Sequence, residues 1–220
     1  MTTVRSDVRR LGIVGAGKLG TALARRALDA GYDVVISGSG PAQRIRLIVE
    51  VLAPGARVMT THDVAREAEV IVLAVPAHRF KELDRHTFDG KILIDAMNYW
   101  EPIDGSNEEL ANAPYGTSSV VQSWFAGSRV VKGLNQLGYH DIDEGPRPRG
   151  ARERIAVAVA SDDRAAAAEV IDLIDAIGFD ALYVGDLAAG VTLEPDGSAF
   201  GVALSANELS GLLWPEAKRA

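Results

Sequence analysis

The feature that most constrains the fold is a glycine-rich turn near the start of the chain, between an apolar run and a helix-forming run. The sequence there reads Leu11-Gly12-Ile13-Val14-Gly15-Ala16-Gly17-Lys18-Leu19-Gly20. The G-x-G-x-x-G spacing between a strand and a helix is typical of βαβ units that bind the pyrophosphate of a dinucleotide. The first glycine permits a tight turn, the second lets the pyrophosphate approach the backbone, and the third lets helix and strand pack closely. We predict nucleotide contacts along the whole loop, from Gly15, Ala16, Gly17, Lys18, Leu19 and Gly20. The alternative is a glycine turn that binds nothing.

Short β-branched runs alternate with amphipathic stretches along most of the 220 residues. The predicted strands are Leu11–Val14, Val34–Ser37, Arg57–Thr60, Val70–Val75, Lys91–Asp95, Arg129–Gly133, Ile155–Ala160 and Ala181–Val184. The predicted helices are Lys18–Ala30, Pro41–Leu52, His62–Glu67, Ser118–Phe125, Asp163–Ile177 and a short last one near Ser205–Leu213. This alternation favours a parallel sheet covered on both faces, and right-handed crossovers then make it doubly wound. We therefore expect an α/β fold with a mainly parallel, Rossmann-type sheet and a small C-terminal element.

Two segments depart from the alternation, because Met97–Gly116 and His140–Arg154 are polar and rich in turn residues. We expect both to be loops, and loops of this length are usually functional or mobile. The composition changes again after Gly185, where Pro195, Gly197 and Gly201 precede the last helix. We predict a Rossmann-type domain over residues 1–185 and a small element over residues 186–220. That element would pack over the crevice or at a dimer interface.

The end of the second predicted strand indicates which nucleotide binds. NAD sites place an acidic residue there to accept the ribose 2′-hydroxyl. This chain instead has Ser37-Gly38-Ser39-Gly40, followed by Arg44. Hydroxyl groups, glycine amides and a guanidinium can hold a 2′-phosphate that an acidic residue would repel. We therefore predict NADP in preference to NAD, bound by Ser37, Gly38, Ser39 and Arg44. In the alternative interpretation these are ordinary loop and capping residues.

Later strand ends should complete the crevice, because ligands of such sheets bind beyond the carboxyl ends of the strands. Val75 and Pro76 end one strand and are expected beneath the nucleotide. Asn98 and Asn135 follow two others, and could orient a carboxamide or a second ring system by hydrogen bonds. They could equally be turn or capping asparagines. No other catalytic residue is evident, and hydride transfer between two bound rings needs mainly alignment.

Composition excludes several other functions. A net charge of −7 argues against a nucleic-acid partner. The chain has no cysteine, and its four histidines lack metal-ligand spacing, so we expect no metal site. No apolar run approaches the roughly 20 residues that span a membrane. The N-terminal residues 1–10 lack the apolar core of a secretory signal. We accordingly expect a cytoplasmic protein with no membrane partner.

The chain resembles the F420-dependent NADP reductase family, in its bacterial branch, from Leu11 to about Leu213. The motifs that carry the likeness are Val75-Pro76, Ile94-Asp95-Ala96-Met97-Asn98-Tyr99-Trp100, Val130-Val131-Lys132-Gly133-Leu134-Asn135, and the tail from Gly185-Asp186-Leu187 to Leu193-Glu194. The resemblance implies an NADPH-dependent oxidoreductase, expected to be a homodimer, that passes a hydride between NADP(H) and the deazaflavin F420. It also implies that the deazaflavin lies near the nicotinamide, under the C-terminal element.

Two positions depart from the family's pattern. Gly40 stands where the family often has an arginine, and Asn135 stands where the archaeal branch has a histidine. Two other functions therefore remain open: reduction by NADPH of another small acceptor, such as an imine, quinone or metal chelate, and a non-catalytic NADP(H) sensor. The arginines of the His140–Arg154 segment would suit the anionic tail of F420 if that segment lies by the crevice. The alternative is a solvated surface loop.

Overall fold

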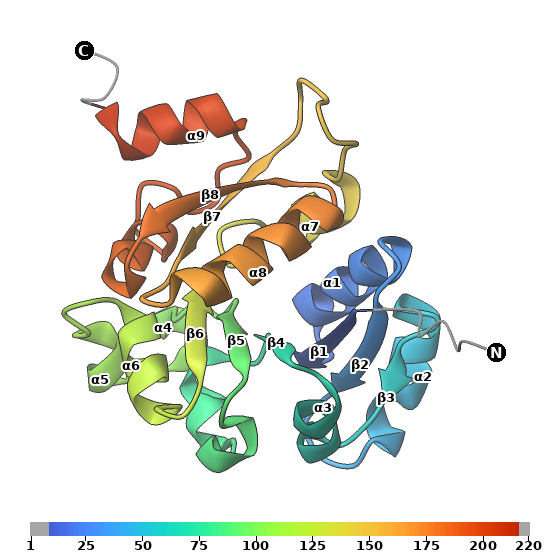
Figure 1. The fold of residues 1–220 in the computed structure, drawn as a ribbon. Helices are drawn as coiled ribbons and strands as arrows, with labels where there is room; N and C mark the ends of the chain where they lie inside the picture. Colours follow the sequence, from blue (N-terminus) through green and yellow to red (C-terminus); the bar gives the residue numbers. More distant parts are fainter. Residues whose placement is uncertain (1–8, 216–220) are drawn as a thin grey trace.

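The computed structural model describes residues 9–215, and its centre is one eight-stranded sheet in the order β3-β2-β1-β4-β5-β6-β7-β8 (Figure 1). The strands are β1 Arg10–Val14, β2 Asp33–Ser37, β3 Arg57–Val58, β4 Val70–Leu73, β5 Ile92–Asp95, β6 Arg129–Lys132, β7 Ala156–Ala160 and β8 Asp180–Gly185. All pairings are parallel except that of β6 with β7, which pair only at Lys132 and Ala160. The predicted α/β fold with a doubly wound, mainly parallel Rossmann-type sheet is confirmed.

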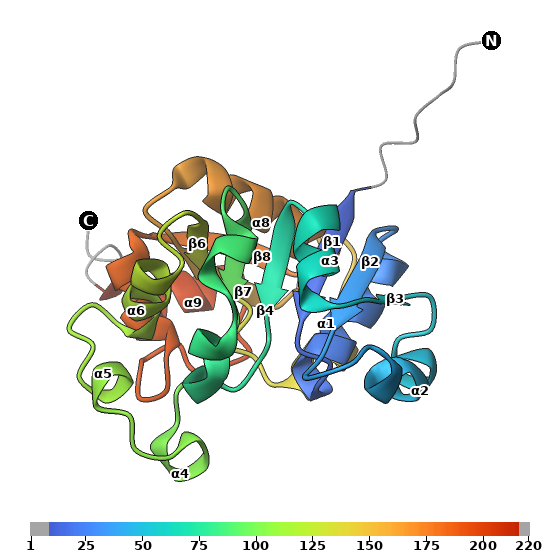
Figure 2. The ribbon, with the colours of Figure 1, turned by 90° about the horizontal axis from the view of Figure 1, so that it is seen from below.

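Helices cover both faces of the sheet, as Figures 1 and 2 show. The α-helices are α1 Lys18–Asp29, α2 Gln43–Leu52, α3 Thr61–Glu67, α4 Glu101–Asp104, α5 Glu108–Ala111, α6 Thr117–Trp124, α7 Tyr139–Glu144, α8 Arg164–Ala176 and α9 Ala206–Leu213. Three 3₁₀ segments are η1 Ala77–Glu82, η2 Arg85–Phe88 and η3 Leu187–Leu193. Among these described residues, no helix is long and apolar enough to cross a membrane.

The eight predicted strands all form, but some boundaries were wrong. The strand predicted to end at Val75 ends at Leu73, because the chain turns there toward Pro76, the N-cap residue of η1. The segment Met97–Gly116 is not wholly a loop, since it contains α4 and α5. The segment His140–Arg154 likewise begins inside α7. Short helices of four to six residues carry too little periodicity to be distinguished from turns in a sequence.

Alternating strand side chains build a core on each face of the sheet. Leu11, Ile13 and Val72 point toward α1 and α8 and join one cluster. Ile71 and Leu73, one position out of phase, join a second cluster with α3, η1 and α6. Near-continuous apolar runs therefore suit these strands, because both faces are buried.

The C-terminal segment packs on the β7–β8 part of the sheet. Leu193, Ala199 and Leu209 form a third buried cluster with Ala156 and Ala158 of β7. The division into residues 1–185 and 186–220 stays a prediction, and its ends, residues 1–8 and 216–220, lie outside the described residues. The expected absence of a signal segment in residues 1–10 also falls mostly on those undescribed residues.

Candidate functional site

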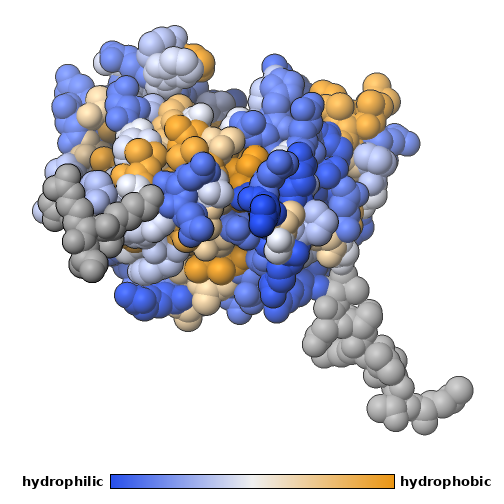
Figure 3. Space-filling model, turned by 90° about the horizontal axis from the view of Figure 1, so that it is seen from above, coloured by the Kyte–Doolittle hydropathy of each residue, from blue (hydrophilic) through white to orange (hydrophobic). Residues whose placement is uncertain are grey.

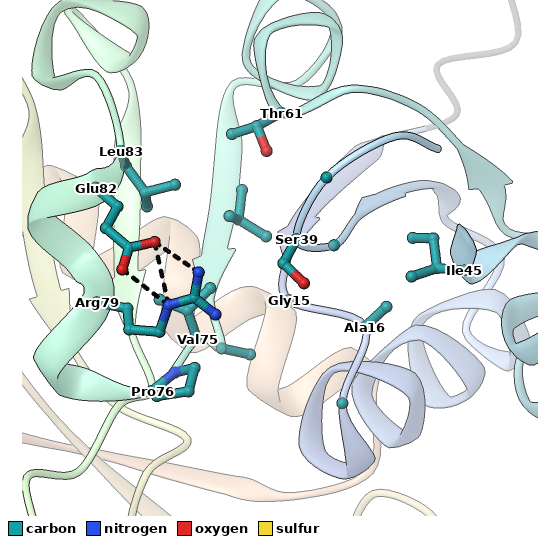
Figure 4. A pocket seen from close by; sticks show the side chains of 15 residues that line it. Gly15, Ala16, Ser39, Ile45, Thr61, Val75, Pro76, Arg79, Glu82 and Leu83 are labelled. Atoms are coloured by element: carbon teal, nitrogen blue, oxygen red, sulfur yellow. Dashed lines mark hydrogen bonds and ion pairs between the residues drawn. The ribbon is translucent and has the colours of Figure 1, made fainter. Parts of the chain in front are cut away.

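A cavity of about 490 Å³ opens at the carboxyl ends of β1, β2 and β4 (Figure 4). This is the position in which open α/β sheets bind ligands. Its walls are formed by Val14, Gly15, Ala16, Gly17, Gly38, Ser39, Gly40, Ile45, Thr61, Ala74, Val75, Pro76, Arg79, Glu82 and Leu83. Most of the predicted nucleotide-binding residues therefore meet in one pocket.

The three fingerprint glycines have three different structural reasons to be glycine. Gly15 has φ +120°, and a Cβ there would lie 2.2 Å from the carbonyl oxygen of Ala74. A Cβ on Gly20 would lie 1.9 Å from the carbonyl oxygen of Gly15. A Cβ on Gly17 would meet nothing within 4 Å, because Gly17 faces the open pocket. The first and third glycines are required by the fold, whereas the second leaves room for a ligand.

The N-terminus of α1 provides an anion site next to Gly17. No side chain caps this helix, so its first amides are available to a phosphate. The side chains of Lys18 and Leu19 do not line the pocket. Lys18 places its ammonium 3.3 Å from the Tyr139 hydroxyl, and Leu19 packs against the core. These two residues can therefore serve a pyrophosphate only through their backbone.

The hydroxyl groups at the end of β2 are arranged differently from the sequence-based expectation. Ser37 is buried and lies with its Oγ 3.1 Å from Oγ1 of Thr61, while its carbonyl accepts a hydrogen bond from Gly15. Ser37 does not line the pocket, whereas Ser39 and Thr61 do. The sequence analysis missed Thr61. It begins α3 directly after a strand next to β2, and that position could have indicated it.

Arg44 lies beside Gly40. Gly40 stands at the position where the family often has an arginine. A Cβ on Gly40 would be 3.4 Å from Nη1 of Arg44, so the guanidinium lies against this glycine. Arg44 is exposed, and within residues 9–215 its guanidinium makes no hydrogen bond or ion pair. Its free guanidinium is suited to hold an anion at this end of the pocket.

Asn98 and Asn135 bind each other instead of facing the pocket. The Asn98 amide donates to the Asn135 carbonyl at 2.8 Å, and the Asn135 amide donates to Oδ1 of Asn98 at 2.9 Å. The Asn135 amide also donates to the carbonyl of Leu193 at 2.6 Å. The pair therefore ties the ends of β5 and β6 to the C-terminal segment. A role in orienting a second ring stays a prediction.

A buried ion pair lies behind those asparagines and was not anticipated from the sequence. Nζ of Lys132 donates to the Met97 carbonyl at 2.6 Å and lies 3.4 Å from Oδ2 of Asp95. The same Oδ2 accepts a hydrogen bond of 2.6 Å from Ser118. Lys132 and Asp95 are both fully buried. This network fixes the turn that carries Asn98.

Two further groups near the crevice were also missed. Arg79 and Glu82 form an ion pair on the pocket wall, drawn in Figure 4. His78 also belongs to η1, and its Nδ1 lies 2.7 Å from Oδ1 of Asp104. Asp104 also accepts from the Trp100 amide, and its side chain is only 5% exposed. A histidine held by a carboxylate is an arrangement typical of proton transfer.

The predicted basic loop does not lie by the pocket. Arg154 is buried and binds Asp175 at 2.7 Å and Asp180 at 3.0 Å, and Arg149 also pairs with Asp175. These guanidinium groups, Arg149 first, lower the pKa of Asp175. No residue of this loop lines the pocket. The lining of this pocket gives no support to the hypothesis that the loop serves an anionic ligand, and Arg149 and Arg154 pair instead with acidic residues at the end of α8 and the start of β8.

In the described part of the chain, no group of three histidine, cysteine, aspartate or glutamate side chains could hold a metal ion. The polar groups that line the pocket are backbone amides, hydroxyl groups and the Arg79–Glu82 ion pair.

The nucleotide pocket is also the part of the chain that matches a known family. The profile of the family described as NADP oxidoreductase, coenzyme F420-dependent, matches residues 10–99. The match covers the glycine-rich turn and the end of β2, and it agrees with the resemblance inferred from the sequence.

Three known proteins resemble the chain over most of its length. The chain is 28% identical over 196 residues to the metalloreductase STEAP3 of Rattus norvegicus, covering 88% of this chain but only 37% of that protein. A hypothetical protein of Sinorhizobium meliloti has a TM-score of 0.79 at 23% identity, over 91% of this chain and 97% of that one. A protein of Arthrobacter sp. FB24, proposed to be an F420-dependent NADP-reductase, has a TM-score of 0.66 at 21% identity, over 89% and 98%. The two structures share the fold.

Proposed function

We propose that this protein transfers a hydride between NADP(H) and the deazaflavin F420. The observation that carries the proposal is the acid-free wall at the end of β2, where Ser39 and Thr61 line the pocket and the guanidinium of Arg44 lies against Gly40. The F420-dependent family that matches residues 10–99 supports the second substrate.

In this proposal the nucleotide binds in one orientation. The 2′-phosphorylated ribose belongs at Ser39 and Arg44, and the pyrophosphate at Gly17 and the start of α1. The nicotinamide half must then extend past Pro76 toward the ends of β5 and β6, where Asn98 is held. Open space at Gly17 and the unpartnered Arg44 fit such a ligand.

Side chains next to that end suit a second flat ring. Trp100, Tyr115 and Val191 are large, exposed and apolar, and they belong to the segments after β5 and to η3. Val191 lies against Gly116, and Glu194 receives hydrogen bonds from the backbone and hydroxyl of Thr117. The C-terminal segment is thereby fixed beside these side chains. Bound NADPH supplies the hydride, and the protein aligns the two rings and excludes water.

The direct experiment mixes purified protein with NADPH and F420 and follows both absorbances. Loss of F420 absorbance in step with NADPH oxidation supports the proposal. Tight NADPH binding without F420 turnover contradicts it. Substituting NADH measures the preference for the phosphorylated nucleotide.

A second candidate function is the reduction of another small acceptor that must also receive a proton, such as an imine or quinone. The observation that favours it is the His78–Asp104 pair, because simple alignment of two rings does not require such an acid. Turnover with a cyclic imine or a quinone, and none with F420, would support this candidate. A His78→Asn variant would then lose turnover while keeping its NADPH affinity.

We also propose a homodimer. Four large aliphatic side chains of α2 are exposed, namely Leu47, Ile48, Val51 and Leu52. Figure 3 shows apolar side chains at the right edge of the molecule, the side on which α2 lies in Figure 1. An exposed apolar stripe of this kind is typical of an interface. Light scattering of the wild type and of Leu47→Lys tests it, since the variant should be monomeric. Cytoplasmic location stays a prediction.

A further inference from the structure

The nucleotide pocket contains an ion pair that its phosphate-binding features do not explain. Of the residues that line it, Arg79 and Glu82 are the charged ones. Both belong to η1, which follows β4, and Figure 4 shows them on the wall across from Gly15 and Ser39.

The ion pair holds the guanidinium group of Arg79 by one edge. Nε lies 3.0 and 3.1 Å from the two carboxylate oxygens of Glu82, and Nη2 lies 2.6 Å from Oε2. This contact raises the pKa of Arg79 and lowers the pKa of Glu82. The Nη1 side of the guanidinium is not engaged by Glu82, and its two flat faces are free to stack on an aromatic ring.

Aliphatic side chains surround the same part of the pocket. Leu83 and Val75 lie on the side of Arg79, and Ile45 lies on the opposite side, as Figure 4 shows. Aliphatic walls and a planar cation suit a flat, apolar ring that carries polar edges. The nucleotide has two rings, and the end of β2 places the adenosine half here.

We propose that Arg79 is a stacking platform for the purine of the nucleotide and that Glu82 is the positioning residue that holds this platform in place. This inference rests on the proposed NADP(H) site and names what recognises the base. The two arginines of the pocket region then have separate tasks: Arg44 binds the 2′-phosphate and Arg79 binds the purine.

The charges argue against a phosphate on Arg79. One of its donor edges already faces the Glu82 carboxylate, and a phosphate bound at the remaining Nη1 side would still lie close to that like charge. Arg44 has no such competitor among the described residues.

Two fragments of the nucleotide separate these tasks, because 5′-AMP and 2′,5′-ADP differ only in the phosphate on the 2′-oxygen. We expect Arg79→Met to weaken binding of both fragments by about five- to tenfold, the size of a partly desolvated cation–π contact. The ratio of the two dissociation constants should stay unchanged. Arg44→Ala should instead weaken 2′,5′-ADP selectively. Calorimetry measures the dissociation constant of each fragment for wild type and for both variants.

Lys81→Met is the matched control. Lys81 is a cation on the same 3₁₀ segment, but it pairs with Glu109 and lies over the ring of Trp124, away from the pocket. Its removal should change neither fragment's affinity. Arg79→Lys should weaken both fragments nearly as much as Arg79→Met, because an ammonium is not planar. Glu82→Gln should weaken both to a smaller extent.

Two results would overturn the proposed role of Arg79, and a third would overturn the proposed nucleotide site on which it rests. Selective loss of 2′,5′-ADP in Arg79→Met would make Arg79 a phosphate ligand. Unchanged affinities in both Arg79 variants, with melting temperatures equal to wild type, would make the pair a plain surface ion pair. If wild type binds neither fragment, the nucleotide site itself is wrong.

Discussion

Gly20 packs so closely on Gly15 that a Cβ at position 20 would lie 1.9 Å from the Gly15 carbonyl oxygen. Gly17 lies between them in sequence, yet a Cβ there would contact nothing. The fingerprint therefore contains glycines required by the fold and one glycine that leaves room for a ligand. A side chain at Gly20 should lower stability, whereas a side chain at Gly17 should lower nucleotide affinity and leave stability unchanged.

Gly17→Val is expected to fold with a melting temperature near that of wild type and to lose both NADP(H) and NAD(H) binding, because the side chain occupies the pyrophosphate position. Thermal melting with and without NADPH measures both effects. Gly20→Val is the control, and it should be strongly destabilised before any ligand is added. If NADPH still stabilises the Gly17→Val protein, the proposed nucleotide site is contradicted.

Ser39→Asp should lower NADP(H) affinity about tenfold or more while changing NAD(H) affinity little. Like charges about 4 Å apart repel by roughly 4 kcal/mol at an effective dielectric of 20, before solvent and salt reduce the repulsion. Ser37→Asp, at the other serine predicted to bind the 2′-phosphate, is less suitable, because Ser37 is buried and faces Thr61. Titration of nucleotide fluorescence gives the ratio of affinities. An unchanged ratio would show that the phosphate lies elsewhere.

Lys132→Met should destabilise the protein by about 3–5 kcal/mol, because it leaves the buried Asp95 carboxylate without its cation. The control is Lys91→Met, whose partner Glu69 is exposed, with an expected effect below about 1 kcal/mol. Urea unfolding measures both. If the two variants are equally stable, Lys132 is not the counter-ion of Asp95.

Acid should destabilise the region around Asp175. Its pKa is lowered in the folded protein by Arg149 and Arg154, so the carboxylate stabilises the fold above its unfolded pKa near 3.8. That stabilisation is lost as pH falls through the lower, folded pKa. Asp175→Asn should therefore reduce stability at neutral pH and flatten the acid limb of a plot of melting temperature against pH. Asp172→Asn, which alters an exposed contact with Arg9, should leave the plot unchanged.

Patterns local in sequence predicted most of the fold. The order of strands and long helices follows from apolar periodicity, and the fingerprint places the pocket, since the turn after β1 has one possible location in a doubly wound sheet. Ser39, Val75 and Pro76 line the pocket as expected. Short helices such as α4 and α5 were missed, because four residues give no usable periodicity.

The sequence by itself determined the sheet, the glycine-rich loop at the pocket, and the absence of an acidic residue at the end of β2. Tertiary structure decided which side chains line the pocket. Ser37 contacts Thr61, Asn98 binds Asn135, and Arg154 binds Asp175. Arg79 and Glu82 line the pocket, although no sequence motif predicted it. The physical reason is that a side chain's partner is set by segments distant in sequence that packing brings within hydrogen-bonding distance. Only the folded chain specifies those distances.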